Sequence, residues 1–122
     1  MKIAVIGCGR WGSLIAWYLD RLGHTVTLYG RENSVRMRRF IAERKNDFLT
    51  LPDSVGLSTS LDFLSDSEAV VISIGAQNLQ NLMETLRPLH LRNKIWILCM
   101  KGIEITTGRR LSQVAGDNLD PS

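Results

Sequence analysis

The chain has 122 residues, enough to bury one hydrophobic core but too few for two domains of ordinary size, so we expect a single domain over residues 1–122. Hydrophobic residues make up 44% and charged residues 22%, an ordinary balance for a soluble globular protein, and no apolar run approaches the roughly 20 residues that span a bilayer. The formal charge of +3 is concentrated between Arg31 and Arg44, and so local a patch favours a solvated basic helix or a surface for cofactor phosphates over a nucleic-acid partner.

An apolar strand at residues 2–6 runs straight into the glycine turn Gly7-Cys8-Gly9-Arg10-Trp11-Gly12, which opens a helix. In such a Gly-x-Gly-x-x-Gly turn the first glycine permits the tight turn. The second lets the backbone approach a pyrophosphate, and the third lets the helix pack closely on the strand. The backbone amides of Arg10 and Trp11 would face that pyrophosphate. We therefore expect a dinucleotide here, although a purely structural turn, with Trp11 as a core anchor, stays open.

The helix after the turn carries apolar residues at helical spacing, and these predict the face that packs on the sheet. Gly23 ends this helix, and residues 25–29 form a second strand that completes a strand–helix–strand unit. The predicted apolar face consists of Trp11, Leu14, Ile15, Tyr18, Leu19 and Leu22.

The second strand ends at Tyr29-Gly30-Arg31, where proteins that prefer NAD usually carry a carboxylate for the adenosine ribose. Arg31 can instead stack on adenine, or pair with the 2′-phosphate of NADP through two planar hydrogen bonds. Because Glu32 can still reach a ribose hydroxyl, NAD stays open, but NADP is slightly favoured.

The rest of the chain continues the alternation. We expect a helix over residues 34–44, a short strand at 57–59, a helical turn near 61–64, buried strands at 69–74 and 95–100, and a further helix near Thr107. Between the buried strands lies a helix whose apolar face is Leu79, Leu82, Met83 and Leu86, with Pro88 beyond its end. The pattern predicts an α/β fold, a Rossmann-type doubly wound parallel sheet of about five strands in a single domain.

Lys101 follows the last expected strand directly and would stand at the edge of the sheet that borders the ligand crevice. Its ammonium could bind a substrate oxygen or phosphate there, but a lysine in such a place is more often a solvated charge. No cysteine and histidine spacing typical of a zinc site is present, so we expect no metal.

Five segments together resemble the N-terminal domain of NAD(P)-dependent glycerol-3-phosphate dehydrogenase, in order and spacing over nearly the whole chain. The tryptophan inside the glycine turn and the Lys-Gly-Ile-Glu segment are more discriminating than the glycines alone. The segments are Gly7-Cys8-Gly9-Arg10-Trp11-Gly12, Leu28-Tyr29-Gly30-Arg31, Asn46-Asp47-Phe48-Leu49, Ile74-Gly75-Ala76-Gln77 and Lys101-Gly102-Ile103-Glu104 with Thr107-Gly108.

The resemblance implies roles for particular residues of this sequence. It implies that Arg10, Trp11 and Arg31 contact the cofactor and that Phe48 borders its site. It also implies that Lys101 reaches both the substrate and the nicotinamide end, so Lys101 is the expected catalytic residue. The implied reaction is reversible hydride transfer between NAD(P)H and dihydroxyacetone phosphate, giving sn-glycerol 3-phosphate for phospholipid synthesis.

The sequence departs from the family in several places. The family usually has a proline where Gly75 stands, a small polar residue where Met100 stands, and a longer segment between Phe48 and Leu57. In the family a helical C-terminal domain supplies the proton-transferring lysine and most ligands of the substrate phosphate. This sequence does not contain that domain, so we expect the chain alone to bind NAD(P) but to be largely inactive.

Two other functions stay open. One is a free-standing NAD(P)-binding sensor or partner module, and the other is the first half of a different two-domain dehydrogenase. A homo-oligomer is open as well. The start Met1-Lys2-Ile3 is already part of the first strand and does not resemble a secretory signal, so we expect a cytoplasmic protein.

Overall fold

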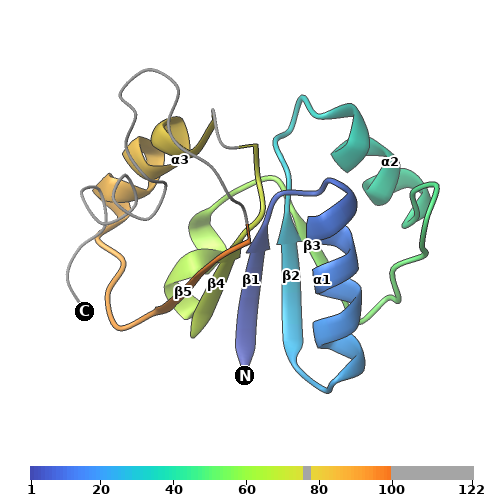
Figure 1. Cartoon of the computed structure of the whole chain (residues 1–122), viewed down its shortest axis with the longest axis horizontal. Coiled ribbons are helices and arrows are strands. Elements are labelled where there is room, and N and C mark those ends of the chain that lie inside the picture. Colours follow the sequence, from blue (N-terminus) through green and yellow to red (C-terminus); the bar gives the residue numbers. More distant parts are fainter. Residues whose placement is uncertain (76–77, 100–122) are drawn as a thin grey trace.

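A single parallel sheet of five strands organises the chain (Figure 1). The computed structural model describes residues 1–75 and 78–99, so the helix expected near Thr107 and the end of the last expected strand lie outside the described residues. The strands are β1 (Lys2–Ile6), β2 (Thr25–Tyr29), β3 (Gly56–Ser58), β4 (Ala69–Ile72) and β5 (Ile95–Leu98). Their order is β3-β2-β1-β4-β5, which confirms the predicted Rossmann-type doubly wound sheet.

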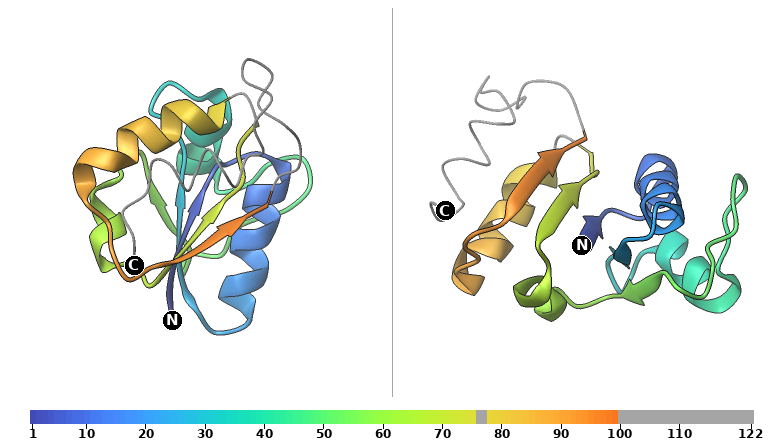
Figure 2. Two further views of the ribbon diagram at one scale, coloured as in Figure 1. Left: turned by 60° about the vertical axis from the view of Figure 1, so that its left-hand side comes forward. Right: turned by 90° about the horizontal axis from the view of Figure 1, so that it is seen from below.

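Helices cover both faces of the sheet. Successive side chains of β1 point to opposite faces and are buried in two separate cores, one under each layer of helices. Ile3 and Val5 belong to the core that includes residues of α1 (Arg10–Arg21) and α2 (Val35–Glu43). Ala4 and Ile6 belong to the core that includes α3 (Leu79–Leu86). Figure 2 shows α1 and α3 on opposite sides of the sheet. Two 3₁₀ helices, η1 (Asp62–Asp66) and η3 (Arg87–Leu89), complete the described elements. None of the described helices is long and apolar enough to cross a membrane.

The last residues of neighbouring strands pair with one another, so the loops that follow the strands begin side by side. Ile6 at the end of β1 pairs with Tyr29 at the end of β2 and with Ile72 at the end of β4. Ile72 in turn pairs with Leu98, the last residue of β5. The segments that follow these strands therefore gather along one edge of the sheet, on both sides of β1, where the direction of the chain connections reverses.

The predicted apolar face of α1 is wrong in part. Four of its members are exposed, namely Trp11, Leu14, Tyr18 and Leu22, whereas Ile15 and Leu19 are half-buried against the core. The buried face consists instead of Gly12, Ser13 and Ala16. The reason is steric: a Cβ on Gly12 would lie 1.8 Å from the carbonyl oxygen of Gly7. So close an approach leaves room on this face only for small residues.

The two long apolar runs behave differently from each other. All four residues of β4 are buried, as expected for a strand covered on both faces. In β5, however, Ile95 is 54% exposed and Ile97 is 43% exposed, so the expectation of two covered faces is wrong for this edge strand. The helix between them matches the prediction, because its four apolar residues are buried and Pro88 follows its last turn.

Candidate functional site

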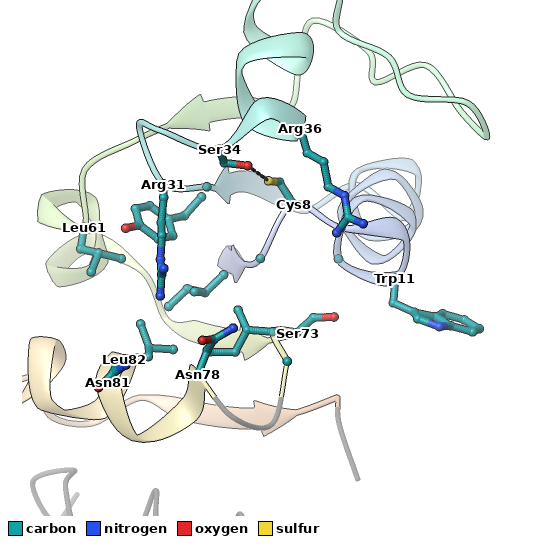
Figure 3. Close-up of a pocket in the computed structure, with 18 of the residues that line it drawn as sticks. Cys8, Trp11, Arg31, Ser34, Arg36, Leu61, Ser73, Asn78, Asn81 and Leu82 are labelled. Atoms are coloured by element: carbon teal, nitrogen blue, oxygen red, sulfur yellow. Dashed lines mark hydrogen bonds between the residues drawn. The ribbon is translucent and has the colours of Figure 1, made fainter. Parts of the chain in front are cut away.

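A cavity of about 860 Å³ opens at the carboxyl edge of the sheet (Figure 3). Its walls are the glycine turn after β1, the loop after β2, the segment after β4 and one side of α3. Among the described residues of the wall the charged ones are three arginines and one carboxylate, so this part of the cavity favours an anionic ligand. These charged residues are Arg10, Arg31, Arg36 and Glu32.

The glycine turn has the shape that its motif requires. Gly7 has φ +116°, and a Cβ there would lie 2.0 Å from the carbonyl oxygen of Ser73. At Gly12, too, a Cβ would clash with backbone, in that case with the carbonyl oxygen of Gly7. Among the described residues other than its chain neighbours, a Cβ on Gly9 would meet one atom within 4 Å, Nη1 of Arg36 at 3.2 Å. Gly7 and Gly12 therefore hold the turn together, whereas Gly9 offers open backbone to a ligand.

The first amides of α1 are available to an anion. The helix begins at Arg10, and no side chain of the described residues caps its N-terminus. Ser13 is turned back instead, since its hydroxyl donates to the carbonyl oxygens of Gly9 at 2.7 Å and of Arg10 at 3.1 Å. Uncapped amides and the positive end of the helix dipole are the usual partners of a phosphate. Together with the open cradle at Gly9, they fit a dinucleotide pyrophosphate.

The loop after β2 is held against the glycine turn. A Cβ on Gly30 would lie 2.8 Å from Sγ of Cys8 and 2.8 Å from the side chain of Met37, so only glycine fits there. Ser34 caps α2 by accepting a hydrogen bond from the Met37 amide at 3.2 Å, and its hydroxyl lies 3.6 Å from Sγ of Cys8. From this loop the side chain of Arg31 extends into the cavity (Figure 3).

A turn at residues 46–49 brings Phe48 to the N-terminus of α1. Oδ1 of Asn46 accepts hydrogen bonds from the amides of Phe48 at 2.8 Å and Leu49 at 2.9 Å, while its Nδ2 donates to Oγ of Ser13 at 3.1 Å. The guanidinium of Arg10 lies 4.3 Å from the centre of the Phe48 ring. Asn46 thus ties the turn to α1 and places an aromatic ring beside the glycine turn.

The residues predicted for the site do not all lie in one place. Gly7, Gly9, Arg10, Trp11, Gly12 and Arg31 line the main cavity. Phe48 lines a smaller adjoining cavity of about 180 Å³, which it shares with Arg10 and Arg36. Trp11 is 67% exposed, so the alternative that it only anchors the core is wrong. Lys101 lies outside the described residues.

The sequence reasoning missed several residues of the wall. Arg36 falls in the basic patch noted above, and its position in the first turn of a helix after the cofactor loop was the available signal. The other missed polar residues have no comparable signal, because their place depends on how the strand ends and α3 meet. They are Ser73, Asn78, Asn81 and Thr85, whereas Asn33 and Ser34, which were also missed, follow Arg31 and Glu32 in the loop after β2.

Comparison with known proteins agrees with this geometry. Residues 2–122 match the model of the family described as NAD-dependent glycerol-3-phosphate dehydrogenase N-terminus. The chain is 33% identical over 123 residues to a glycerol-3-phosphate dehydrogenase [NAD(P)+] of Thermoanaerobacter sp. strain X514, covering 98% of this chain and 37% of that protein. It is 37% identical over 117 residues to the protein of the same name from Rhodospirillum rubrum, covering 93% of this chain and 34% of that protein.

Solved structures show the same fold. The glycerol-3-phosphate dehydrogenase of Coxiella burnetii superposes with a TM-score of 0.85 at 23% identity, over 98% of this chain and 38% of that one. The enzyme of Saccharomyces cerevisiae gives a TM-score of 0.80 at 24% identity, over 98% of this chain and 39% of that one. The chain thus spans 34–39% of the length of each of these four relatives. From the family match over residues 2–122, the chain belongs to the family of the N-terminal domain of NAD-dependent glycerol-3-phosphate dehydrogenase.

Proposed function

We propose that this chain is the cofactor-binding half of a glycerol-3-phosphate dehydrogenase and that the cavity at the carboxyl edge of the sheet holds NAD or NADP. The observation that carries the proposal is the glycine turn. Gly9 exposes its backbone to the cavity, and the uncapped first amides of α1 point the positive end of a helix at the same place. The family match over residues 2–122 supports the same proposal.

The proposed reaction interconverts sn-glycerol 3-phosphate and dihydroxyacetone phosphate, and the bound nicotinamide cofactor supplies or accepts the hydride. The described residues contribute binding and orientation. The turn at residues 7–12 holds the pyrophosphate, and the loop after β2 borders the adenosine end. Proton transfer needs a positioned acid or base. The described wall of the cavity contains one carboxylate, Glu32, at the β2 end of the cavity, and we assign it no proton-transfer role.

We assign Lys101 to the substrate end. The cavity extends to Cys99, the last described residue, two positions before Lys101 in the sequence. In this proposal the lysine ammonium contacts both the substrate and the nicotinamide, as the resemblance implies. Hydride transfer on a phosphorylated substrate also needs a clamp for the substrate phosphate. The proposal leaves that clamp to the part of the relatives that this chain does not span, so the isolated chain binds cofactor without turnover.

We favour NADP over NAD. The side chain of Arg31 extends into the cavity and makes no hydrogen bond or ion pair with the described residues, so its guanidinium is available to a phosphate (Figure 3). Glu32 stands beside it with an exposed side chain, and a carboxylate in that place is the feature that would favour NAD. The proposal includes a cytoplasmic location and a product that is used for phospholipid synthesis. It also includes a homo-oligomer of the full-length protein.

The test is a titration of the purified chain of 122 residues with NADPH and with NADH, followed by calorimetry, with dihydroxyacetone phosphate reduction assayed in the same samples. The proposal expects saturable binding of both cofactors, tighter for NADPH, and no turnover. Turnover would contradict the assignment of proton transfer and substrate clamping to another part of the protein. The absence of binding would contradict the proposal as a whole.

A further inference from the structure

Arg36 is the residue of α2 that reaches the glycine turn. It stands in the first turn of the helix, whose start is fixed by the Ser34 cap and by the burial of Met37. From there the side chain crosses toward the turn (Figure 3). Its Nη1 lies 3.2 Å from the position that a Cβ on Gly9 would occupy. Arg36 also lines both the main cavity and the smaller adjoining one, so its guanidinium stands between them.

The other arginines of α2 are engaged elsewhere. Nε of Arg38 donates to the carbonyl oxygen of Glu32 at 3.3 Å. Arg39 is paired with Asp47 at 2.8 Å and with Glu43 at 3.2 Å, and the hydrogen bond to Asp47 raises the pKa of Arg39 above its usual value. Within the described residues the side chain of Arg36 makes no hydrogen bond or ion pair.

A guanidinium placed this way has one evident use. Gly9 is the glycine whose missing side chain lets a pyrophosphate approach the backbone. Apart from the neighbours of Gly9 in the chain, Arg36 is the one described residue with an atom within 4 Å of the position that a Cβ on Gly9 would occupy. Arginine binds phosphate oxygens through two parallel hydrogen bonds, which are stronger than hydrogen bonds between neutral groups. The guanidinium and the first amides of α1 would then contact the same anion from two sides.

On the basis of the function proposed above, we propose that Arg36 is a cofactor-binding residue that holds the pyrophosphate of NAD(P) against Gly9. Arg31, in the loop after β2, and Arg36, in the helix that follows it, then have different roles. Arg31 extends toward the middle of the cavity, on the other side of that loop, and serves the adenosine end (Figure 3). Arg36 serves the pyrophosphate, which NAD and NADP share, so it contributes to affinity and not to the choice between the two cofactors.

The test compares Arg36→Ala with Arg38→Ala. Both variants remove one positive charge from the exposed surface of α2, but Arg38 does not line either cavity. The affinities of the full chain of 122 residues for NADH and NADPH are measured by calorimetry at one fixed salt concentration. We expect Arg36→Ala to lower the affinities for NADH and NADPH by a similar factor, about tenfold or more, as for a lost hydrogen bond to a charged group. Arg38→Ala should change either affinity less than threefold.

The outcomes separate this inference from the proposed function. If the unsubstituted chain binds both cofactors and Arg36→Ala matches Arg38→Ala, the role of Arg36 is refuted and the cofactor site stands. If Arg36→Ala weakens NADPH much more than NADH, the guanidinium binds the 2′-phosphate and the assignment to the pyrophosphate is wrong. If the unsubstituted chain binds neither cofactor, the proposed function fails together with the inference. A cooperative thermal transition near that of the unsubstituted chain shows that each variant is folded.

Discussion

Replacing Gly9 by valine separates binding from folding at the centre of the site. The backbone of Gly9 has φ −73° and ψ −169°, an extended conformation that any residue adopts. In the part of the chain that the structure describes, a Cβ there would meet the far end of the Arg36 side chain, which can move away. The added isopropyl group would therefore fit the folded protein while filling the surface that the pyrophosphate must approach.

The expected magnitudes follow from these contacts. Valine is a poorer helix N-cap than glycine, which costs about 1 kcal/mol of stability and lowers Tm by about 4 °C. Displacing the pyrophosphate removes about two hydrogen bonds to a charged group, each contributing about 1.5–3 kcal/mol. Affinity for NADH and NADPH should thus fall by at least about a hundredfold. Gly9→Ala, with a smaller side chain at the same place, should give a smaller loss.

The assay is a calorimetric titration of the wild-type and variant chains with each cofactor, accompanied by thermal unfolding followed by circular dichroism. A folded Gly9→Val chain with unchanged affinity would refute the claim that the pyrophosphate approaches the backbone at this glycine. A variant that fails to fold would contradict the geometry at Gly9 itself, because the structure shows room there.

Three further substitutions test other parts of the site. Arg31→Ala should lower the affinity for NADPH by about tenfold and the affinity for NADH by clearly less. Equal losses of affinity in a binding titration would mean that Arg31 contributes only by stacking on adenine. Gly12→Ala should destabilise the fold by about 3 kcal/mol in urea unfolding, because its Cβ would lie 1.8 Å from the carbonyl oxygen of Gly7. A normal midpoint would mean that α1 does not pack as closely as the structure shows. Asn46→Ala should weaken cofactor binding a few-fold by releasing the turn that places Phe48, and unchanged affinity would show that this ring does not contribute.

The sequence predicted the sheet well because local and long-range signals agreed. The glycine turn, the spacing to Tyr29 and the alternation of apolar runs with amphipathic helices are compatible with few topologies, since parallel crossovers are right-handed. The glycine turn also lies where the sequence placed it, at the carboxyl end of β1 beside the cavity. Chain order therefore carried most of the information about the fold.

Side-chain direction could not be read in the same way. The apolar periodicity of α1 marks residues that share a face, but it does not say whether that face meets the sheet. Because α1 approaches the sheet closely at Gly12, its buried face consists of small residues, and Trp11 and Tyr18 are exposed. Similarly, Arg36 was one arginine among several in a basic patch. Only the packing of α2 on the core shows which of them reaches Gly9.

The central claim is that a dinucleotide binds with its pyrophosphate at the N-terminus of α1, and amide NMR tests it most directly. The chain is labelled with ¹⁵N and titrated with NADPH while the backbone amide resonances are followed. The account predicts that the amides of Gly9, Arg10 and Trp11 shift strongly and saturably. The amide of His24, which directly precedes the amino end of β2 at the opposite edge of the sheet, should not shift. Saturable shifts that leave the glycine turn unchanged, or no shifts at all, would contradict it.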